Sequence, residues 1–217
     1  MSVLPPCIVL SSHVTGLWVT RTLGRRGVAV RVLPVGDADL GQFSRLASAR
    51  EAVFRGDVDS LAALLMANGP RWEGSVLLAT SDLALETLAR HGSSLGEHYR
   101  LRVPPWETVR LLLRKNDTAC IASRRGIDVP ANYGPVGAPG VPRPEVRFPV
   151  VIKPNDSFRF EQRFGKKLLV AGGRTEFVRQ LDLVRQERID GEILELIPGP
   201  DSLSFNYTGY YDSSQRL

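Results

Sequence analysis

The stretch "CIVLSSHVTGLWVTRTLGRRGVAVRVLPV", residues 7–35, contains two kinds of apolar pattern. It opens with a continuous apolar run, which is typical of a strand buried on both faces of a sheet. Apolar residues then recur with helical spacing from Val14 to Leu23, and Gly27 marks the expected end of that helix. A second apolar run, residues 28–35, follows. The stretch predicts a parallel β-α-β unit with a right-handed crossover.

The same alternation continues to about residue 104. It predicts a helix, a strand and a second helix at residues 58–69, 75–80 and 81–96. Ser81 or Asp82 is the expected cap of that second helix. The turn "SSHVTG", residues 11–16, lacks the GxGxxG pattern, which favours a tight strand-to-helix turn over a dinucleotide site. Residues 1–104 are therefore predicted to form a small doubly wound α/β domain.

The composition is that of an ordinary globular protein: 217 residues, 43% hydrophobic, 24% charged, with a mean hydropathy of -0.09. No apolar run approaches the roughly 20 residues that span a bilayer, and nothing resembles a signal peptide, so we expect a cytoplasmic protein with no membrane partner. The net charge is +5, but the arginines are scattered, so no nucleic-acid partner is expected. Cys7 and Cys120 predict neither a disulfide framework nor a metal site.

Lysine is rare in this chain. Only four of the 28 basic residues are lysines: Lys115, Lys153, Lys166 and Lys167. In a chain that otherwise uses arginine, a lysine indicates a site that needs a compact point charge. The alternative is that these four lysines occur by chance.

The second half of the chain mixes helices and strands. Helices are expected at 107–113 and, capped by Asn116 or Asp117, up to Gly126. The Pro- and Gly-rich stretch 133–149 predicts a loop or linker. Beyond it we expect strands, a polar loop to about Lys166 and one helix, with the strands at 150–153, 167–172 and 192–197 and the helix at 175–186.

The last residues alternate apolar and polar side chains over Leu203, Phe205 and Tyr207, which predicts a strand that opens a hairpin. The return strand would follow beyond Leu217. We therefore expect the sequence to be the front part of a longer protein, and the genomic frame beyond Leu217 tests this.

Two short stretches carry the chemistry. In "FPVVIKPNDS", residues 148–157, Lys153 ends a strand, and burying its stem there favours an anionic partner. With Lys115 at a helix start and the polar loop that follows Lys153, it suggests a phosphate cradle different from a P-loop. In "ELIPGPD", residues 195–201, a strand edge offers an N–H and a C=O that can bind an adenine ring, and an acid follows.

These motifs resemble, in their order, the ATP-grasp superfamily, and more narrowly the predicted ATP-dependent carboxylate-amine ligases. The matching stretches are "GIDVP", "FPVVIKP", "GKKLLV" and "LELIPGPDS". The resemblance implies an α/β fold: a Rossmann-like pre-ATP-grasp domain at 1–104, then the first (α+β) subdomain of an ATP-grasp domain within 105–217. The latter would contain a small lid subdomain at about 140–198 and the start of the C-terminal subdomain at 199–217.

The resemblance also implies binding residues for ATP. Lys115 and Lys153 match lysines that contact the phosphates, and Lys166 or Lys167 would lie beyond a phosphate-covering flap whose tip passes through Ser157. Glu195, Leu196 and Ile197 match the hinge that binds adenine through backbone groups, and Asp201 matches the acid that binds ribose. The family often has an acid beside the helix-start lysine, where this chain has Arg114. Catalytic residues and metal ligands are not identified, and Mg²⁺ ligands are expected beyond Leu217.

The implied function is ATP-dependent ligation of a small carboxylate to an amine through an acyl-phosphate. The 217-residue chain alone is expected to have little or no ligase activity. A homodimer is compatible with this hypothesis. The alternative is a nucleotide-binding or regulatory α/β module without ligation, such as a Rossmann-type fragment that binds NAD at the Gly16 turn.

Overall fold

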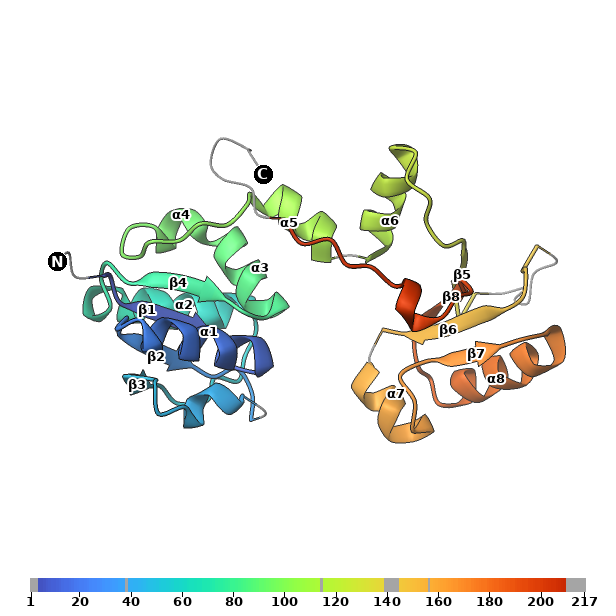
Figure 1. Ribbon diagram of the computed structural model, residues 1–217, viewed down its shortest axis with the longest axis horizontal. Coiled ribbons are helices and arrows are strands. Elements are labelled where there is room, and N and C mark those ends of the chain that lie inside the picture. The colour runs from blue at the N-terminus through green and yellow to red at the C-terminus, as the bar shows by residue number, and fades with distance from the viewer. Residues whose placement is uncertain (1–3, 38, 114, 139–144, 156, 210–217) are drawn as a thin grey trace. The chain divides into compact units, whose positions relative to one another are not determined.

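The computed structural model describes residues 4–37, 39–113, 115–138, 145–155 and 157–209. The chain divides into two compact units, residues 1–125 and 126–217, which are described separately (Figure 1). Among the described residues, no helix combines the length and the apolar character needed to cross a bilayer. The domain boundary expected near residue 104 stays a prediction.

The first unit is built on a parallel four-stranded sheet in the order β3-β2-β1-β4. Cys7 of the central strand lies opposite Val30 on one side and Val76 on the other. The predicted parallel β-α-β unit is therefore confirmed. The strands are β1 (Cys7–Leu10), β2 (Val30–Leu33), β3 (Ala49–Arg50) and β4 (Val76–Ala79).

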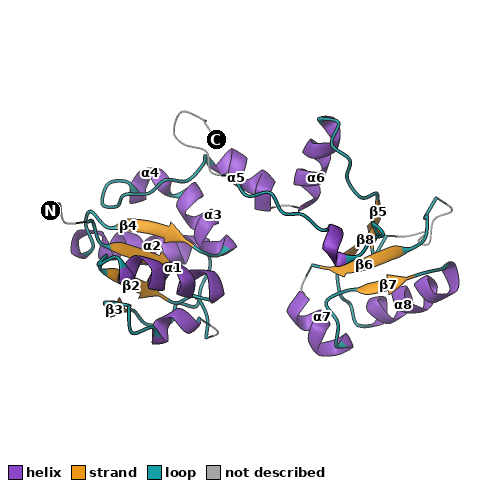
Figure 2. Cartoon of the chain, in the orientation of Figure 1, coloured by secondary structure: helices purple, strands orange, loops and turns teal. Residues whose placement is uncertain are grey.

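Helices cover both faces of this sheet, as the buried strands require (Figure 2). Ile8 and Leu10 pack against α2 and α3, whereas Cys7 and Val9 pack against α1. The Ser81 side chain caps α3 by accepting a hydrogen bond from Ala84 N at 3.3 Å. The helices are α1 (Val14–Arg25), α2 (Val58–Asn68), α3 (Asp82–Arg90), α4 (Gly92–Leu95), α5 (Trp106–Leu113) and α6 (Lys115–Arg124), with 3-10 turns η1 (Leu40–Phe43) and η2 (Gly69–Arg71).

The turn from β1 to α1 is packed tightly by polar groups. The buried Asp39 carboxylate accepts hydrogen bonds from the backbone N–H groups of Ser12 and Val35, each at 2.6 Å. Thr80 Oγ1 donates to Ser11 O at 2.6 Å, and both atoms lie against Gly16. This packing supports the interpretation of residues 11–16 as a tight turn.

Replacing Gly16 with alanine is expected to lower the free energy of unfolding by about 1–3 kcal/mol. A Cβ there would lie 2.4 Å from Ser11 O, a backbone atom, and 2.8 Å from Thr80 Oγ1. The matched control is Gly92→Ala, whose Cβ would meet only the end of the flexible Leu101 side chain at 3.4 Å. Denaturant unfolding of both variants tests this, and equal stability of Gly16→Ala and Gly92→Ala would contradict the proposed close packing.

The two thiols are expected to differ in reactivity. Cys7 is 3% exposed, and burial raises the pKa of its thiol to about 12, whereas Cys120 is exposed on α6. At pH 8 the Cys7 thiol stays protonated and shielded, so iodoacetamide should modify the native protein at Cys120 and both thiols only after unfolding. Peptide mass spectrometry measures this, with Cys120→Ser as the control. Equal labelling of Cys7 in the native protein would contradict its burial.

The second unit is built on an antiparallel four-stranded sheet in the order β5-β8-β6-β7. Val150, Ile152 and Ile193 point to one face, where α7 and α8 contribute the fully buried Phe160 and Phe177. The elements are β5 (Asn132–Pro135), β6 (Val150–Pro154), α7 (Ser157–Phe164), β7 (Leu169–Ala171), α8 (Arg174–Gln186), β8 (Gly191–Glu195) and the 3-10 turn η3 (Asp201–Leu203).

Two expected loops contain regular structure. The stretch 133–149 was predicted to be unpaired, but its first residues belong to β5, which pairs with β8 because its backbone can still form a ladder around Gly134. The polar stretch before Lys166 contains α7. Phe160 and Phe164 lie one helical turn apart with ring centroids 4.6 Å from each other, and burial of Phe160 in the core favours the helix over a loop.

Two other expectations are wrong in detail. Helix α6 begins at Lys115, so Asn116 and Asp117 lie in its first turn and do not precede it. The strand expected over Leu203–Tyr207 does not form: Asp201–Leu203 is a 3-10 turn, and residues 204–209 belong to no strand. Phe205 is 86% exposed, so no packing against the described residues supports an extended strand there.

Candidate nucleotide-binding site

The end of β8 is held by its two neighbours in different ways. On the β5 side, Glu195 N donates to Ala131 O at 2.8 Å. The reciprocal ladder bond is replaced, because Ala131 N donates to the Glu195 side-chain Oε2 at 2.9 Å. On the β6 side, Leu196 N donates to Pro149 O at 3.2 Å, and Pro149 has no N–H to return.

This arrangement leaves backbone groups available at one strand edge. N–H and C=O of one residue point to the same side of a strand, and successive residues alternate. The Glu195 C=O therefore points to the β5 side, since Leu196 N of the same peptide group donates on the β6 side. The strand β8 ends at Glu195, and the same alternation continued for two residues would turn the Ile197 N–H to the β5 side as well. The Glu195 oxygen lacks its ladder bond from Ala131, and Ile197 N has no hydrogen-bond partner among the described residues. Pro198 offers no further donor.

This acceptor and this donor, neither of which has a main-chain partner among the described residues, lie two residues apart, and Ile197 itself is 60% exposed. Adenine presents the complementary pair on its Watson–Crick edge, where the 6-amino group donates and N1 accepts. The predicted hinge residues Glu195, Leu196 and Ile197 thus have a geometry that can bind adenine through backbone groups.

Lys153 lies on the face of the same sheet that points away from α7 and α8. It is exposed, which corrects the expectation that its stem is half-buried, because the alternation that buries Ile152 turns Lys153 to the opposite face. Glu192 lies directly opposite on β8, yet none of the ion pairs among the described residues includes Lys153. Its ammonium is therefore available to an anion.

The predicted phosphate-binding residues of this unit lie toward one end of the sheet. Lys166 and Lys167 are exposed between α7 and β7, and β7 begins at Leu169, which pairs with Ile152. Ser157 is the first residue of α7, directly after β6. Glu195 pairs with Val150, so three residues of strand, about 10 Å, separate the hinge from Lys153.

Other predicted residues are described by backbone position alone. Lys115 begins α6 in the first unit, and Asp201 begins η3 four residues beyond Ile197. The side chains of Lys115, Ser157 and Asp201 lie outside the described part of the structure, so their predicted contacts stay predictions. Within the described ranges, no three His, Cys, Asp or Glu side chains gather in a way that could hold a metal ion.

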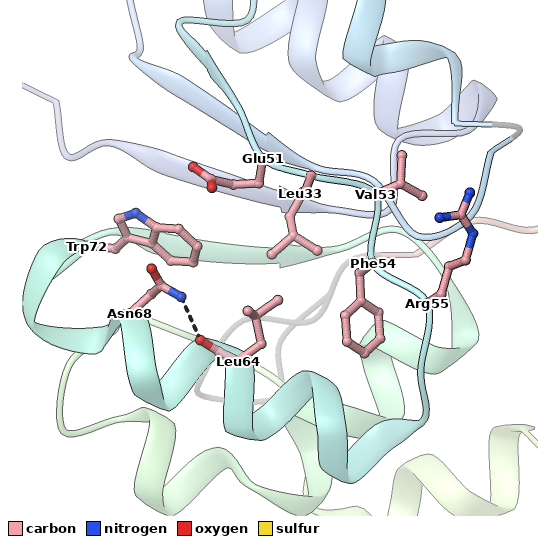
Figure 3. Close-up of a pocket in the computed structure, with 9 residues that line it drawn as sticks. Leu33, Glu51, Val53, Phe54, Arg55, Leu64, Asn68 and Trp72 are labelled. Carbon is pink, nitrogen blue, oxygen red and sulfur yellow. Dashed lines mark hydrogen bonds between the residues drawn. The ribbon is translucent and has the colours of Figure 1, made fainter.

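A separate cavity lies in the first unit between the sheet and α2 (Figure 3). Its volume is about 210 Å³. Leu33, Phe54 and Leu64 give it an apolar side, while Glu51 and Asn68 lie near Trp72 at the other side. None of the residues predicted to bind ATP lines it.

The sequence matches no known protein family and no curated protein. By structure, the chain is similar to an L-amino acid ligase from Bacillus licheniformis, with a TM-score of 0.64 and 15% identity over 92% of this chain and 46% of the ligase. It is similar to N5-carboxyaminoimidazole synthetase from Staphylococcus aureus complexed with ADP, with a TM-score of 0.63 and 13% identity over 91% and 49% of the two chains.

A third similar structure is the biotin carboxylase domain dimer of Hydrogenobacter thermophilus 2-oxoglutarate carboxylase, in complex with MgADP, ADP and bicarbonate. Its TM-score is 0.58 at 13% identity, over 88% of this chain and 44% of that one. The chain thus spans about half the length of the solved structures it matches. Over that length the chain shares the fold of these solved structures, in agreement with the fold expected from the order of its sequence motifs.

Proposed function

We propose that this chain is the ATP-binding portion of an ATP-dependent carboxylate-amine ligase. The observation that carries the proposal is the acceptor at Glu195 and the donor at Ile197, which have no main-chain partner among the described residues, at the end of a strand that pairs with the strand of the exposed Lys153. Their separation of about 10 Å along the strands suits a nucleotide whose base lies at the hinge and whose phosphates reach Lys153. The ADP complexes of the similar structures support this assignment.

In the proposed complex, backbone groups at the hinge bind adenine and the lysines neutralise the phosphates. Lys153 lies nearest the base, and Lys166 and Lys167 add positive charge at the same end of the sheet. Ser157, Lys115 and Asp201 remain proposed ligands of the phosphates and the ribose. Mg²⁺ is proposed to accompany ATP, because it neutralises charge during phosphoryl transfer. Its ligands are not supplied by a cluster of the described residues.

The reaction proposed for the whole protein begins with transfer of the ATP γ-phosphate to a carboxylate. The acyl-phosphate formed is attacked by an amine, so that a C–N bond forms and inorganic phosphate leaves. Chemistry of this kind depends on positioning and charge neutralisation more than on a protein nucleophile. The residues of this chain would therefore bind and orient ATP and exclude competing orientations. The alternative NAD-binding module is less well supported, because the β1–α1 turn is filled by Ser11, Thr80 and Asp39.

Lys153→Ala is expected to weaken binding of a non-hydrolysable ATP analogue by about 10- to 100-fold, since a charge-assisted contact contributes about 1.5–3 kcal/mol. Isothermal titration calorimetry measures the dissociation constant. Arg179→Ala is the matched control, because it removes the same charge from an exposed position on α8. A similar loss in both variants, or preferential binding of NAD by the unmodified chain, would count against the proposal.

A further inference from the structure

The Glu195 side chain has a position that ATP binding through the backbone alone does not explain. In a regular antiparallel ladder, Ala131 and Glu195 would exchange two main-chain hydrogen bonds. Only one of them forms, from Glu195 N to Ala131 O at 2.8 Å. The other donor, Ala131 N, is taken by Glu195 Oε2 at 2.9 Å. The side chain of Glu195 thus occupies the place of its own main-chain oxygen.

The consequence concerns the main-chain oxygen of Glu195. Without a carboxylate to bind, Ala131 N would have the opposite carbonyl as its nearest acceptor, and the ladder would extend by one bond. That carbonyl would then share its lone pairs with Ala131 and turn toward β5. With the carboxylate in place, the oxygen has no ladder bond, and two residues further on the Ile197 N–H has no hydrogen-bond partner in the described part of the chain.

We propose that the Glu195 side chain is a positioning residue that sets nucleotide specificity: by accepting the Ala131 N–H, it keeps the Glu195 carbonyl free for the 6-amino group of adenine. The inference rests on the proposed function, because it assigns a role within the same adenine site. It adds that the preference for adenine depends on a side chain that does not itself contact the base.

Hypoxanthine is the base that tests this selectivity. Its 6-oxo group accepts where adenine's amino group donates, and its N1–H donates where adenine's N1 accepts. A free Glu195 carbonyl therefore favours adenine and opposes hypoxanthine, because two acceptor oxygens would face each other. If the carbonyl bonds to Ala131, the contact with the amino group and the repulsion of the oxo group both weaken.

The experiment compares the binding of ATP and ITP, as non-hydrolysable analogues, to the 217-residue chain and its variants by calorimetry. Glu195→Ala is expected to lower the ratio of ATP affinity to ITP affinity by about tenfold. Glu195→Asp should behave like Glu195→Ala, because its shorter side chain keeps the charge but does not reach Ala131 N. Glu195→Gln is expected to restore the ratio, since its Oε1 can accept the same hydrogen bond.

The outcomes separate the two proposals. A purely structural role for Glu195 would weaken ATP and ITP binding equally and leave the ratio unchanged, which overturns this inference. Suppose that the Glu195 variants leave the ratio of ATP affinity to ITP affinity unchanged, while Lys153→Ala weakens ATP binding. That result overturns the inference about Glu195 and still supports the proposal that the chain binds ATP. If the unmodified chain binds neither analogue, both proposals fail. Circular dichroism and thermal unfolding check that each variant folds, and the Asp and Gln variants decide the question if Glu195→Ala does not.

Discussion

The hydrogen-bond register of β8 is the constraint on which the proposed site depends. This strand lies between β5 and β6 and must pair with both. At its end the partners are lost, because Pro149 has no N–H to donate and the Ala131 N–H is bound by the Glu195 side chain. As a result, the Glu195 C=O at the hinge has no ladder bond. The site is thus formed where a regular ladder stops, and the strand geometry fixes which groups are free.

The same register determines where positive charge lies. Side chains alternate along β6, so burial of Val150 and Ile152 beneath α7 and α8 requires Lys153 to point to the opposite face. Pairing of Lys153 with Glu192 then fixes its distance from Glu195 in whole residues. A slip by one residue would bury the lysine and expose the core. The register of β6 and β8 therefore determines both the packing of the hydrophobic core and the distance between the hinge and Lys153.

The sequence predicted the elements that depend on residues close together in the chain. The buried strand at Cys7–Leu10 is a continuous apolar run, the strand at Val150–Pro154 begins with one, and Ser81 has the spacing of a helix cap. The sequence pattern did not predict strand β5, because proline and glycine in this stretch are typical of loops. The strand forms through hydrogen bonds to β8, which lies far away in the sequence. Helix α7 was missed because its polar residues outweigh the pair Phe160 and Phe164, whose burial decides the conformation.

The contact between Glu195 and Ala131 joins residues 64 positions apart, so no spacing rule could predict it. This also bears on how the fold is shared at 12–16% identity, without any match in sequence. A site that binds the base through main-chain groups and the phosphates mainly through lysines, as proposed, requires few particular side chains. The strands need only remain apolar on one face and keep their register. The remaining positions can diverge, which would leave specificity to side chains that control which main-chain groups are free, the role proposed for Glu195.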